Sequence, residues 1–185
     1  MPRKADASLE KRILDAGYRL WSEGGEKALT MRAVAQAAGT TTPTVYERFR
    51  DKGDLIDFLR DRARQKMLSA IKLASSPEEA CERALDFTLK YSNEYKLITI
   101  DWAARLGRNE NLPSFAFMKE RLAEYLGGSQ EDHTRLALAL VAEIHGTATL
   151  LFGEEAPGNT AKEIRAACIE ACQTLIGCAP KRKAS

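Results

Sequence analysis

The chain has 185 residues, of which 44% are hydrophobic and 29% charged, with 12 Gly, 6 Pro and 4 Cys. These values exclude collagen-like, intrinsically disordered and disulfide-stabilised chains, and they are typical of one or two small globular domains. The net charge of +2 excludes a histone-like polycation. The first six residues include three charged ones and no apolar segment follows them, so we expect no signal peptide and a cytoplasmic protein.

Capping and turn residues divide the chain into segments of helical length, and no alternating pattern indicates a strand. Ser76-Pro77-Glu78-Glu79, for example, places a serine at the N-cap, a proline at the first helical position and a glutamate at N3. The most apolar stretch, 133–152, contains Arg135, Glu143 and His145, which indicates a buried helix rather than a membrane span. The periodicity predicts an all-α fold of about nine helices, at residues 8–23, 30–38, 42–49, 52–74, 77–93, 95–106, 113–126, 130–152 and 161–176.

Charge and aromatic residues are distributed unevenly along the chain. Residues 1–52 contain ten Lys and Arg against seven Asp and Glu, whereas residues 53–185 contain eighteen against nineteen. Seven aromatic residues lie between positions 87 and 125. We therefore expect a mildly basic domain over 1–52 and a helical body over 53–185, which ends in a disordered, solvated tail at 179–185 that contains Lys181, Arg182 and Lys183.

The most informative segment, residues 30–49, contains two short apolar helical patterns joined by a tight turn. Val34 lies on the apolar face of the first pattern, and Gly39 follows that helix where a C-cap requires a left-handed residue. In the second pattern Val45 and Phe49, four residues apart, are expected to pack against the first helix. This layout predicts a helix-turn-helix, whose second helix can enter the major groove of DNA.

The segment resembles the DNA-binding domain of the tetracycline-repressor (TetR) family of bacterial transcriptional regulators. The resemblance covers about residues 8–59 and places several positions in register, namely Thr30, Ala35, Ala38-Gly39, Thr44-Val45-Tyr46, Phe49 and Lys52. It implies a homodimer that binds a near-palindromic double-stranded DNA operator, with no catalytic role and no cofactor.

The resemblance also implies which residues contact DNA. The expected contacts are Thr30, Arg32, Thr41, Thr42, Pro43, Thr44, Tyr46, Arg48 and Lys52. Tyr46 and Lys52 are expected to bind phosphates, and a lysine at a helix N-terminus opposes the helix dipole, which favours an anionic partner. Arg32 is the best candidate for a bidentate contact with guanine, while Thr42 and Pro43 offer mostly apolar contacts to thymine methyl groups. The basic residues Arg3, Lys4, Lys11 and Arg12 are either a solvated arm or a further DNA contact.

In the family the C-terminal body binds a ligand and dimerises. Two apolar stripes on the 130–152 helix, and one stripe of small residues on the next helix, predict a four-helix interface about a two-fold axis. The expected interface residues are Leu136, Leu140, Ile144, Leu151, Ile164, Cys168, Cys172 and Leu175. A second stripe on the 130–152 helix contains Leu138, Val141, Ala142, Thr149 and Phe152. The expected pocket residues, for an apolar or aromatic effector, are Phe87, Tyr91, Trp102, Phe117, Met118 and His145.

Two alternatives remain open beside a ligand-responsive repressor. One is a constitutive DNA-binding regulator whose aromatic body is only a core. The other is a redox sensor built around Cys168 and Cys172, which lie four residues apart on one helix face, although buried packing is the simpler role for cytosolic cysteines. No histidine or third cysteine follows at a short ligand spacing, so we expect no metal site, and no phosphate-binding loop or nucleophile elbow indicates an enzyme.

Overall fold

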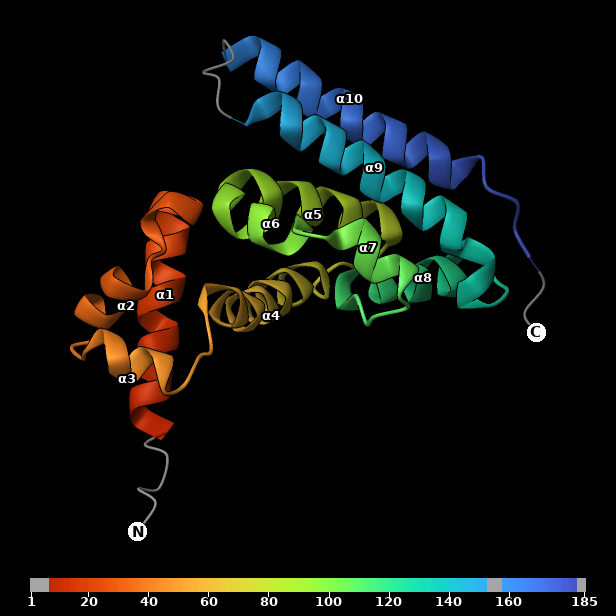
Figure 1. The fold of residues 1–185 in the computed structure, drawn as a ribbon. Coiled ribbons are helices and arrows are strands. Elements are labelled where there is room, and N and C mark those ends of the chain that lie inside the picture. Colours follow the sequence, from red (N-terminus) through yellow and green to blue (C-terminus); the bar gives the residue numbers. More distant parts are fainter. Residues whose placement is uncertain (1–6, 153–157, 183–185) are drawn as a thin grey trace. The chain divides into compact units, whose positions relative to one another are not determined.

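The computed structural model describes residues 7–152 and 158–182, and these ranges contain ten α-helices, one 3-10 helix and no strand. In chain order they are α1 (Ala7–Ala28), α2 (Met31–Ala37), α3 (Thr42–Tyr46), α4 (Lys52–Ile71), α5 (Pro77–Lys90), α6 (Ser92–Thr99), α7 (Trp102–Gly107), α8 (Pro113–Leu126), η1 (Gln130–His133), α9 (Thr134–Leu151) and α10 (Gly158–Gly177) (Figure 1). The all-α prediction is confirmed. No helix in these ranges has the length and apolar character needed to cross a membrane. Arg3, Lys4 and Lys183 lie outside the described residues.

Packing divides the described chain into two compact units. The first contains residues 7–63 together with 93–100, and the second contains residues 64–92 together with 101–182. Helix α4 contributes to both units. The compact unit that carries the helix-turn-helix therefore includes the start of α4 and helix α6, beyond the domain boundary expected after residue 52.

In the first unit, α1 buries one face, which carries Ile13, Ala16 and Trp21. The helix runs past its expected end at residue 23 and is kinked at Gly25, whose φ of 63° and ψ of −153° are not helical. Glycine adopts this left-handed region without the steric cost that a Cβ imposes. Leu29, which follows the helix, is completely buried and joins the core of this unit.

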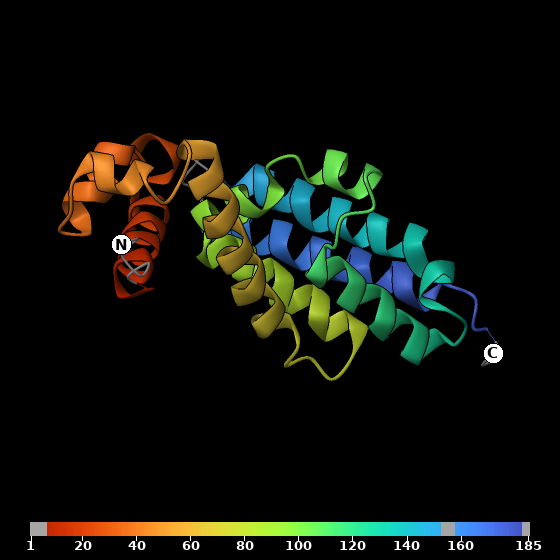
Figure 2. The same ribbon diagram turned by 60° about the horizontal axis from the view of Figure 1, so that its bottom comes forward.

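The second unit is a bundle whose core is built mainly by α5, α8, α9 and α10, and α9 and α10 lie side by side along most of their length (Figure 2). Each of the four helices contributes a completely buried side chain: Leu85, Leu122, Leu140 and Ile176. Burial of a leucine or isoleucine side chain stabilises a fold by about 1.5–3 kcal/mol. These four helices therefore hold one common apolar core.

Two expected helices are divided in the structure. The 95–106 segment is interrupted at Asp101, whose backbone is left-handed with a φ of 54°, so that α6 ends before it and α7 begins after it. In the 130–152 segment the first turn is the 3-10 helix η1, closed by a capping box between Ser129 and Asp132, and α9 follows. The buried His133 ring, whose Nε2 lies 2.7 Å from the carbonyl oxygen of Gly127, ties this turn to the preceding one.

We expected residues 179–185 to form a free tail, but the structure holds this segment in place as far as Arg182. The backbone N–H of Arg182 donates to the carbonyl oxygen of Leu126 at 2.6 Å, and its guanidinium is 2.8 Å from Asp132. Ala179 packs against the core of the second unit. The segment 179–182 is thus held by specific contacts, because the turn after α8 leaves a carbonyl oxygen and a carboxylate available to it.

Candidate DNA-binding site

Helices α2 and α3 each begin with a threonine cap, as the sequence predicts for a helix-turn-helix. The side-chain oxygen of Thr30 accepts the backbone N–H of Ala33 at 3.1 Å, and that of Thr41 accepts the N–H of Thr44 at 3.4 Å. Gly39, between the two helices, has a left-handed φ of 64°. A hydroxyl at the N-cap satisfies one of the donors that a helix start leaves unpaired, so both short helices have defined first turns.

The residues expected to join the two helices are in the core. Val34, Ala35, Val45 and Phe49 are all at most 2% exposed. The Phe49 ring also packs edge-on against Phe58 of α4, with ring centroids 5.5 Å apart. The core prediction for these residues is confirmed, and their burial fixes which face of α3 remains outside.

The nine expected DNA contacts all have solvent-accessible surface. Five are exposed (Thr30, Arg32, Thr41, Pro43 and Tyr46) and four are partly buried (Thr42, Thr44, Arg48 and Lys52). Tyr46 is 51% exposed although the preceding Val45 is completely buried. Single exposed aromatic residues are ordinary on protein surfaces, and the exposure of Tyr46 leaves its side chain accessible from solvent.

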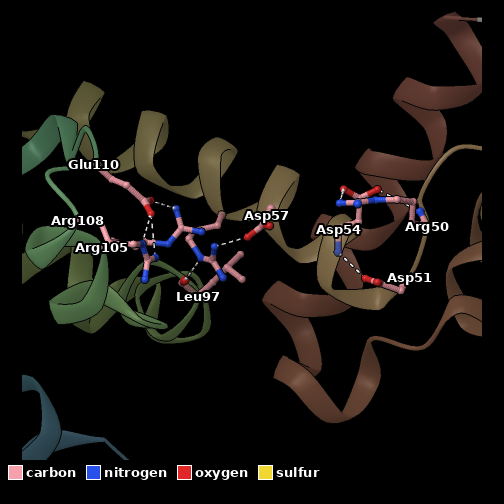
Figure 3. A network of polar contacts seen from close by, with 9 residues as sticks. Arg50, Asp51, Asp54, Asp57, Leu97, Arg105, Arg108 and Glu110 are labelled. Atoms are coloured by element: carbon pink, nitrogen blue, oxygen red, sulfur yellow. Dashed lines mark hydrogen bonds and ion pairs between the residues drawn. The ribbon is translucent and has the colours of Figure 1, made fainter.

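Helix α4 begins with a cap that fixes the position of Lys52. The Asp51 carboxylate accepts the backbone N–H of Asp54 at 2.8 Å and so caps the helix, and the Asp54 carboxylate accepts the N–H of Arg50 at 3.1 Å (Figure 3). The Lys52 ammonium donates to the backbone oxygen of Glu26 at 3.3 Å and lies 3.6 Å from the Glu26 carboxylate. Lys52 is therefore held at the edge of α1 near the start of its own helix.

Helix α6 is bonded to the end of α1, which the sequence pattern does not reveal. The Trp21 indole N–H donates to the backbone oxygen of Asn93 at 2.7 Å, and the Asn93 amide donates to the backbone oxygen of Ser22 at 3.0 Å. The Ser22 hydroxyl donates to Glu94, which is 4% exposed. A buried tryptophan N–H needs a hydrogen-bond acceptor. The presence of Trp21 on the apolar face of its helix is therefore the one sequence signal that could have indicated such a contact, although not which residue makes it.

A buried arginine makes a second connection to α6. Arg60 of α4 is 4% exposed, donates from Nε to the backbone oxygen of Leu97 at 3.3 Å and pairs with Asp57 (Figure 3). A buried guanidinium costs free energy unless its charge and donors are matched. Asp57, on the same helix, matches the charge, and the hydrogen bond to Leu97 joins Arg60 to α6. Together with the tryptophan contact, it makes α6 part of the same rigid unit as the helix-turn-helix.

The six residues expected to line an effector pocket fall into three groups within the second unit. Met118 is in the core of this unit, and Trp102 and Phe117 pack against that core. Phe87 and Tyr91 contact each other with ring centroids 5.1 Å apart, and the Lys66 ammonium lies 3.4 Å from the Tyr91 ring centroid. His145 is on the exposed face of α9. The sequence pattern gave no reason to place Lys66 with these aromatic residues.

The residues expected at a dimer interface divide between the core and the surface. Leu140, Ile144, Cys168 and Cys172 are at most 5% exposed and belong to the core of their own chain, which corrects the expectation that they face a partner. The other four, Leu136, Leu151, Ile164 and Leu175, keep accessible surface. Packing explains the difference, because α9 packs against α5, α8 and α10 through the face that carries Leu140 and Ile144.

The buried cysteines are poor candidates for redox chemistry. Burial raises the pKa of the Cys168 thiol to about 11, and a hydrogen bond with Cys81 together with burial raises that of Cys172. Because the thiolate is the reactive form, these thiols are inert at neutral pH. Within residues 7–152 and 158–182, no group of three or more His, Cys, Asp or Glu side chains is placed to hold a metal ion.

Comparisons with known proteins agree with the helix-turn-helix. Residues 13–58 match the family model described as "Bacterial regulatory proteins, tetR family". No curated protein sequence matches the chain.

Solved structures match over nearly the whole chain. A TetR-family transcriptional regulator from Streptomyces coelicolor is 25% identical, covers 92% of this chain and 98% of its own, and has a TM-score of 0.66. A protein of unknown function from Rhodococcus sp. RHA1 is 21% identical, with 96% and 98% coverage and a TM-score of 0.69. A TetR variant from Acinetobacter baumannii AYE, in complex with minocycline, is 18% identical, with 89% and 92% coverage and a TM-score of 0.63.

The last two structures show the fold alone, while the family model and the Streptomyces regulator carry the assignment. Members of this family are transcriptional regulators and not enzymes. From the matched domain, its capped helix pair and the all-helical body, residues 13–58 are a DNA-binding domain of the kind found in bacterial regulatory proteins of the tetR family, and the chain is similar over most of its length to a transcriptional regulator of that family.

Proposed function

We propose that the protein is a homodimeric, ligand-responsive repressor that binds a near-palindromic operator and leaves it when a small apolar or aromatic molecule binds the helical body. The observation that carries the DNA-binding part is the exposure of Tyr46 beside buried Val45 and Phe49. The core residues fix the orientation of α3, and the tyrosine hydroxyl then projects to the side where a phosphate is available. Lys52 and the capped start of α2 at Thr30 supply further phosphate contacts at helix N-termini.

Arg32 is the residue proposed to read a base. It is exposed in the first turn of α2, and a guanidinium can make two hydrogen bonds to one guanine in the major groove. Thr42, Pro43 and Thr44 at the start of α3 then contribute mostly apolar contacts. Sequence preference should depend strongly on Arg32 and weakly on α3.

The proposed dimer uses the outer faces of α9 and α10. On α9 the exposed positions Ala142, His145, Gly146 and Thr149 recur at helical spacing and are mostly small. On α10 the exposed positions include Ala167 and Leu175, the latter 38% exposed. Small side chains permit close helix approach, and two helices from each subunit would form a four-helix interface with a two-fold axis.

The helical body is the part of the chain that we propose to bind the effector. Partly exposed aromatic side chains of the body, among them Tyr91, Trp102 and Phe117, supply surface for an apolar or aromatic effector. The TetR variant in complex with minocycline, an 18% identical relative in fold, supports a ligand-binding role for a body of this architecture. Helix α4 contributes to both units, so a ligand that shifts it would change operator affinity, typically by about 1–3 kcal/mol.

A DNA-binding titration at several salt concentrations tests the proposal, with operator duplex selected from a random pool by the wild-type protein. Lys52→Ala should weaken binding to all sequences and reduce the slope of log K against log salt by about 0.9. Arg32→Ala should cost about 1–3 kcal/mol on the selected duplex and relax one position in each half-site. Lys72→Ala, an exposed lysine in the second unit, is the control.

Two outcomes would contradict the proposal. Unchanged affinity and salt slope in Lys52→Ala would remove this residue from the interface. If no small aromatic compound in a broad panel changes the affinity for the operator, the protein is a constitutive regulator and not a ligand-responsive one.

A further inference from the structure

An open hollow lies beside the residues proposed to bind phosphate. It has a volume of about 620 Å³ and belongs entirely to the first unit. Its lining comes from the end of α1, the start of α2, the start of α4 and helix α6. The lining residues are Trp21, Gly24, Gly25, Glu26, Lys27, Thr30, Lys52, Asn93, Lys96 and Ile100.

The charged lining of this hollow is mostly basic. Lys27, Lys52 and Lys96 come from three different helices, and Glu26 is the one acidic side chain in the lining. Lys27 and Lys96 are exposed, and Lys52 is partly buried. Three ammonium groups around one concave surface attract an anion more strongly than separate surface lysines do, because a cleft lined by one sign of charge concentrates the field.

The lysine from α6 is held in place by the contacts of that helix. Asn93, which also lines the hollow, is bonded to Trp21 and Ser22 of α1. Arg60 of α4 bonds the backbone of Leu97, one residue after Lys96. Lys96 therefore keeps a fixed position relative to the helix-turn-helix, and binding an anion there costs no rearrangement of the backbone.

We propose that this hollow is a phosphate-binding extension of the DNA interface, in which Lys27 and Lys96 contact the DNA backbone beyond Lys52. This inference rests on the proposed operator binding, because Thr30 and Lys52 line both surfaces. The phosphodiester strand that reaches Lys52 at the start of α4 continues over the hollow. Helix α6 thereby becomes part of the DNA-binding surface.

Glu26 has an opposing role in this arrangement. Its carboxylate lies 3.6 Å from the Lys52 ammonium in the protein without DNA. A phosphate that approaches Lys52 must replace this carboxylate as the partner of the ammonium, and the two anions repel each other at close distance. Glu26 therefore weakens DNA binding while it keeps Lys52 near its bound position through the backbone oxygen.

Neighbouring charge substitutions with opposite expected effects test the proposal. Lys27→Gln and Glu26→Gln remove charges of opposite sign from adjacent positions, and Lys96→Gln removes the α6 charge. Glu23→Gln and Lys72→Gln, exposed positions outside the lining, are the matched controls. Full-length variants are compared by affinity for the selected operator and for random duplex between 50 and 200 mM salt, after thermal unfolding shows that each is folded.

Lys27→Gln and Lys96→Gln should each weaken binding to both duplexes and lower the salt slope by about 0.9, so that the loss is roughly threefold larger at 50 than at 200 mM salt. Glu26→Gln should bind both duplexes more tightly. If these three variants match their controls while Lys52→Ala still weakens binding, the hollow is not a DNA contact and the proposed function stands. If Lys52→Ala also matches its control, the proposed function itself fails.

A second experiment distinguishes binding of DNA from binding of free phosphate. Inorganic phosphate replaces chloride at constant ionic strength, and binding is followed by tryptophan fluorescence in a Trp102→Phe background, where Trp21 is the emitter, with Lys96→Gln as the control. Phosphate binding that needs Lys96, together with DNA affinity that does not, would overturn the DNA assignment and leave a site for small phosphorylated molecules.

Discussion

Substitution of Gly146 tests the proposed dimer, because it should stabilise an isolated subunit but destabilise a dimer that packs against this residue. This glycine lies inside α9, is exposed, and has no atom within 4 Å of the position that a Cβ would take. A glycine inside a helix costs about 1 kcal/mol relative to alanine. For an isolated subunit, Gly146→Ala should therefore raise the free energy of unfolding by about 1 kcal/mol.

The proposed dimer reverses this expectation. If a partner helix packs against the α9 face that contains Ala142, Gly146 and Thr149, an added methyl group overpacks the contact, at about 1–3 kcal/mol per site. A two-fold interface contains the site twice, so dimerisation should weaken by roughly 2–6 kcal/mol, which corresponds to about thirtyfold or more in the dissociation constant. Gly146→Leu should abolish the dimer.

Sedimentation equilibrium and the concentration dependence of thermal unfolding measure both effects. Ala104→Leu places the same side chain at an exposed position of α7 and should leave the oligomeric state unchanged. A dimer that persists in Gly146→Leu, together with a higher unfolding midpoint in Gly146→Ala, would refute the proposed interface.

Two further predictions concern the recognition helix and the body. Thr41→Ala should lower stability by about 1 kcal/mol through loss of the α3 cap and should weaken DNA binding, whereas Thr41→Asp should keep the cap and still weaken binding, because its charge repels phosphate. Operator affinity equal to wild type in Thr41→Asp would place Thr41 outside the interface. The Ser75 backbone N–H and hydroxyl, assisted by Arg83, lower the pKa of Glu79 from 4.5 to about 2. Because the folded-state pKa is the lower one, the carboxylate stabilises the fold above pH 4.5 and loses that contribution as the pH falls towards 2. Glu79→Gln should therefore flatten the acid side of the unfolding curve, measured by circular dichroism, and an unchanged curve would show that this carboxylate does not contribute.

The helix-turn-helix could be predicted from sequence because its determinants are local. The caps at Thr30 and Thr41 bond to residues three positions later, and the left-handed Gly39 lies between them. Val45 and Phe49 are four residues apart and are buried together. Interactions of this range depend only on residues within one or two turns, so the spacing of residue types is sufficient to indicate them.

The place of α6 depends on contacts between distant parts of the chain. The Trp21–Asn93 hydrogen bond joins residues 72 positions apart, and Arg60 reaches Leu97 across 37 positions. Periodicity describes one segment at a time and holds no information about which distant backbone oxygen a tryptophan or arginine will find. The break at Asp101 escapes it as well, because aspartate adopts a left-handed backbone only occasionally.

Side-chain size, rather than hydrophobicity alone, distinguishes the face of α9 that is buried in its own subunit from the face that is exposed. Periodicity identifies both stripes, and the expectation that Leu140 and Ile144 meet a partner is the part that the structure corrects. Leu140 and Ile144 are buried in their own chain, because large side chains are what fills the volume between the helices of a bundle. Leu138 and Val141 of the second stripe also pack against this core, and the exposed face of α9 carries the small residues Ala142, Gly146 and Thr149. A glycine on such a face destabilises the helix and makes no compensating contact within the isolated subunit. A helix from a second subunit can pack closely against it. Of the faces of one helix, the exposed face that carries small side chains is therefore the better candidate for contact with another subunit.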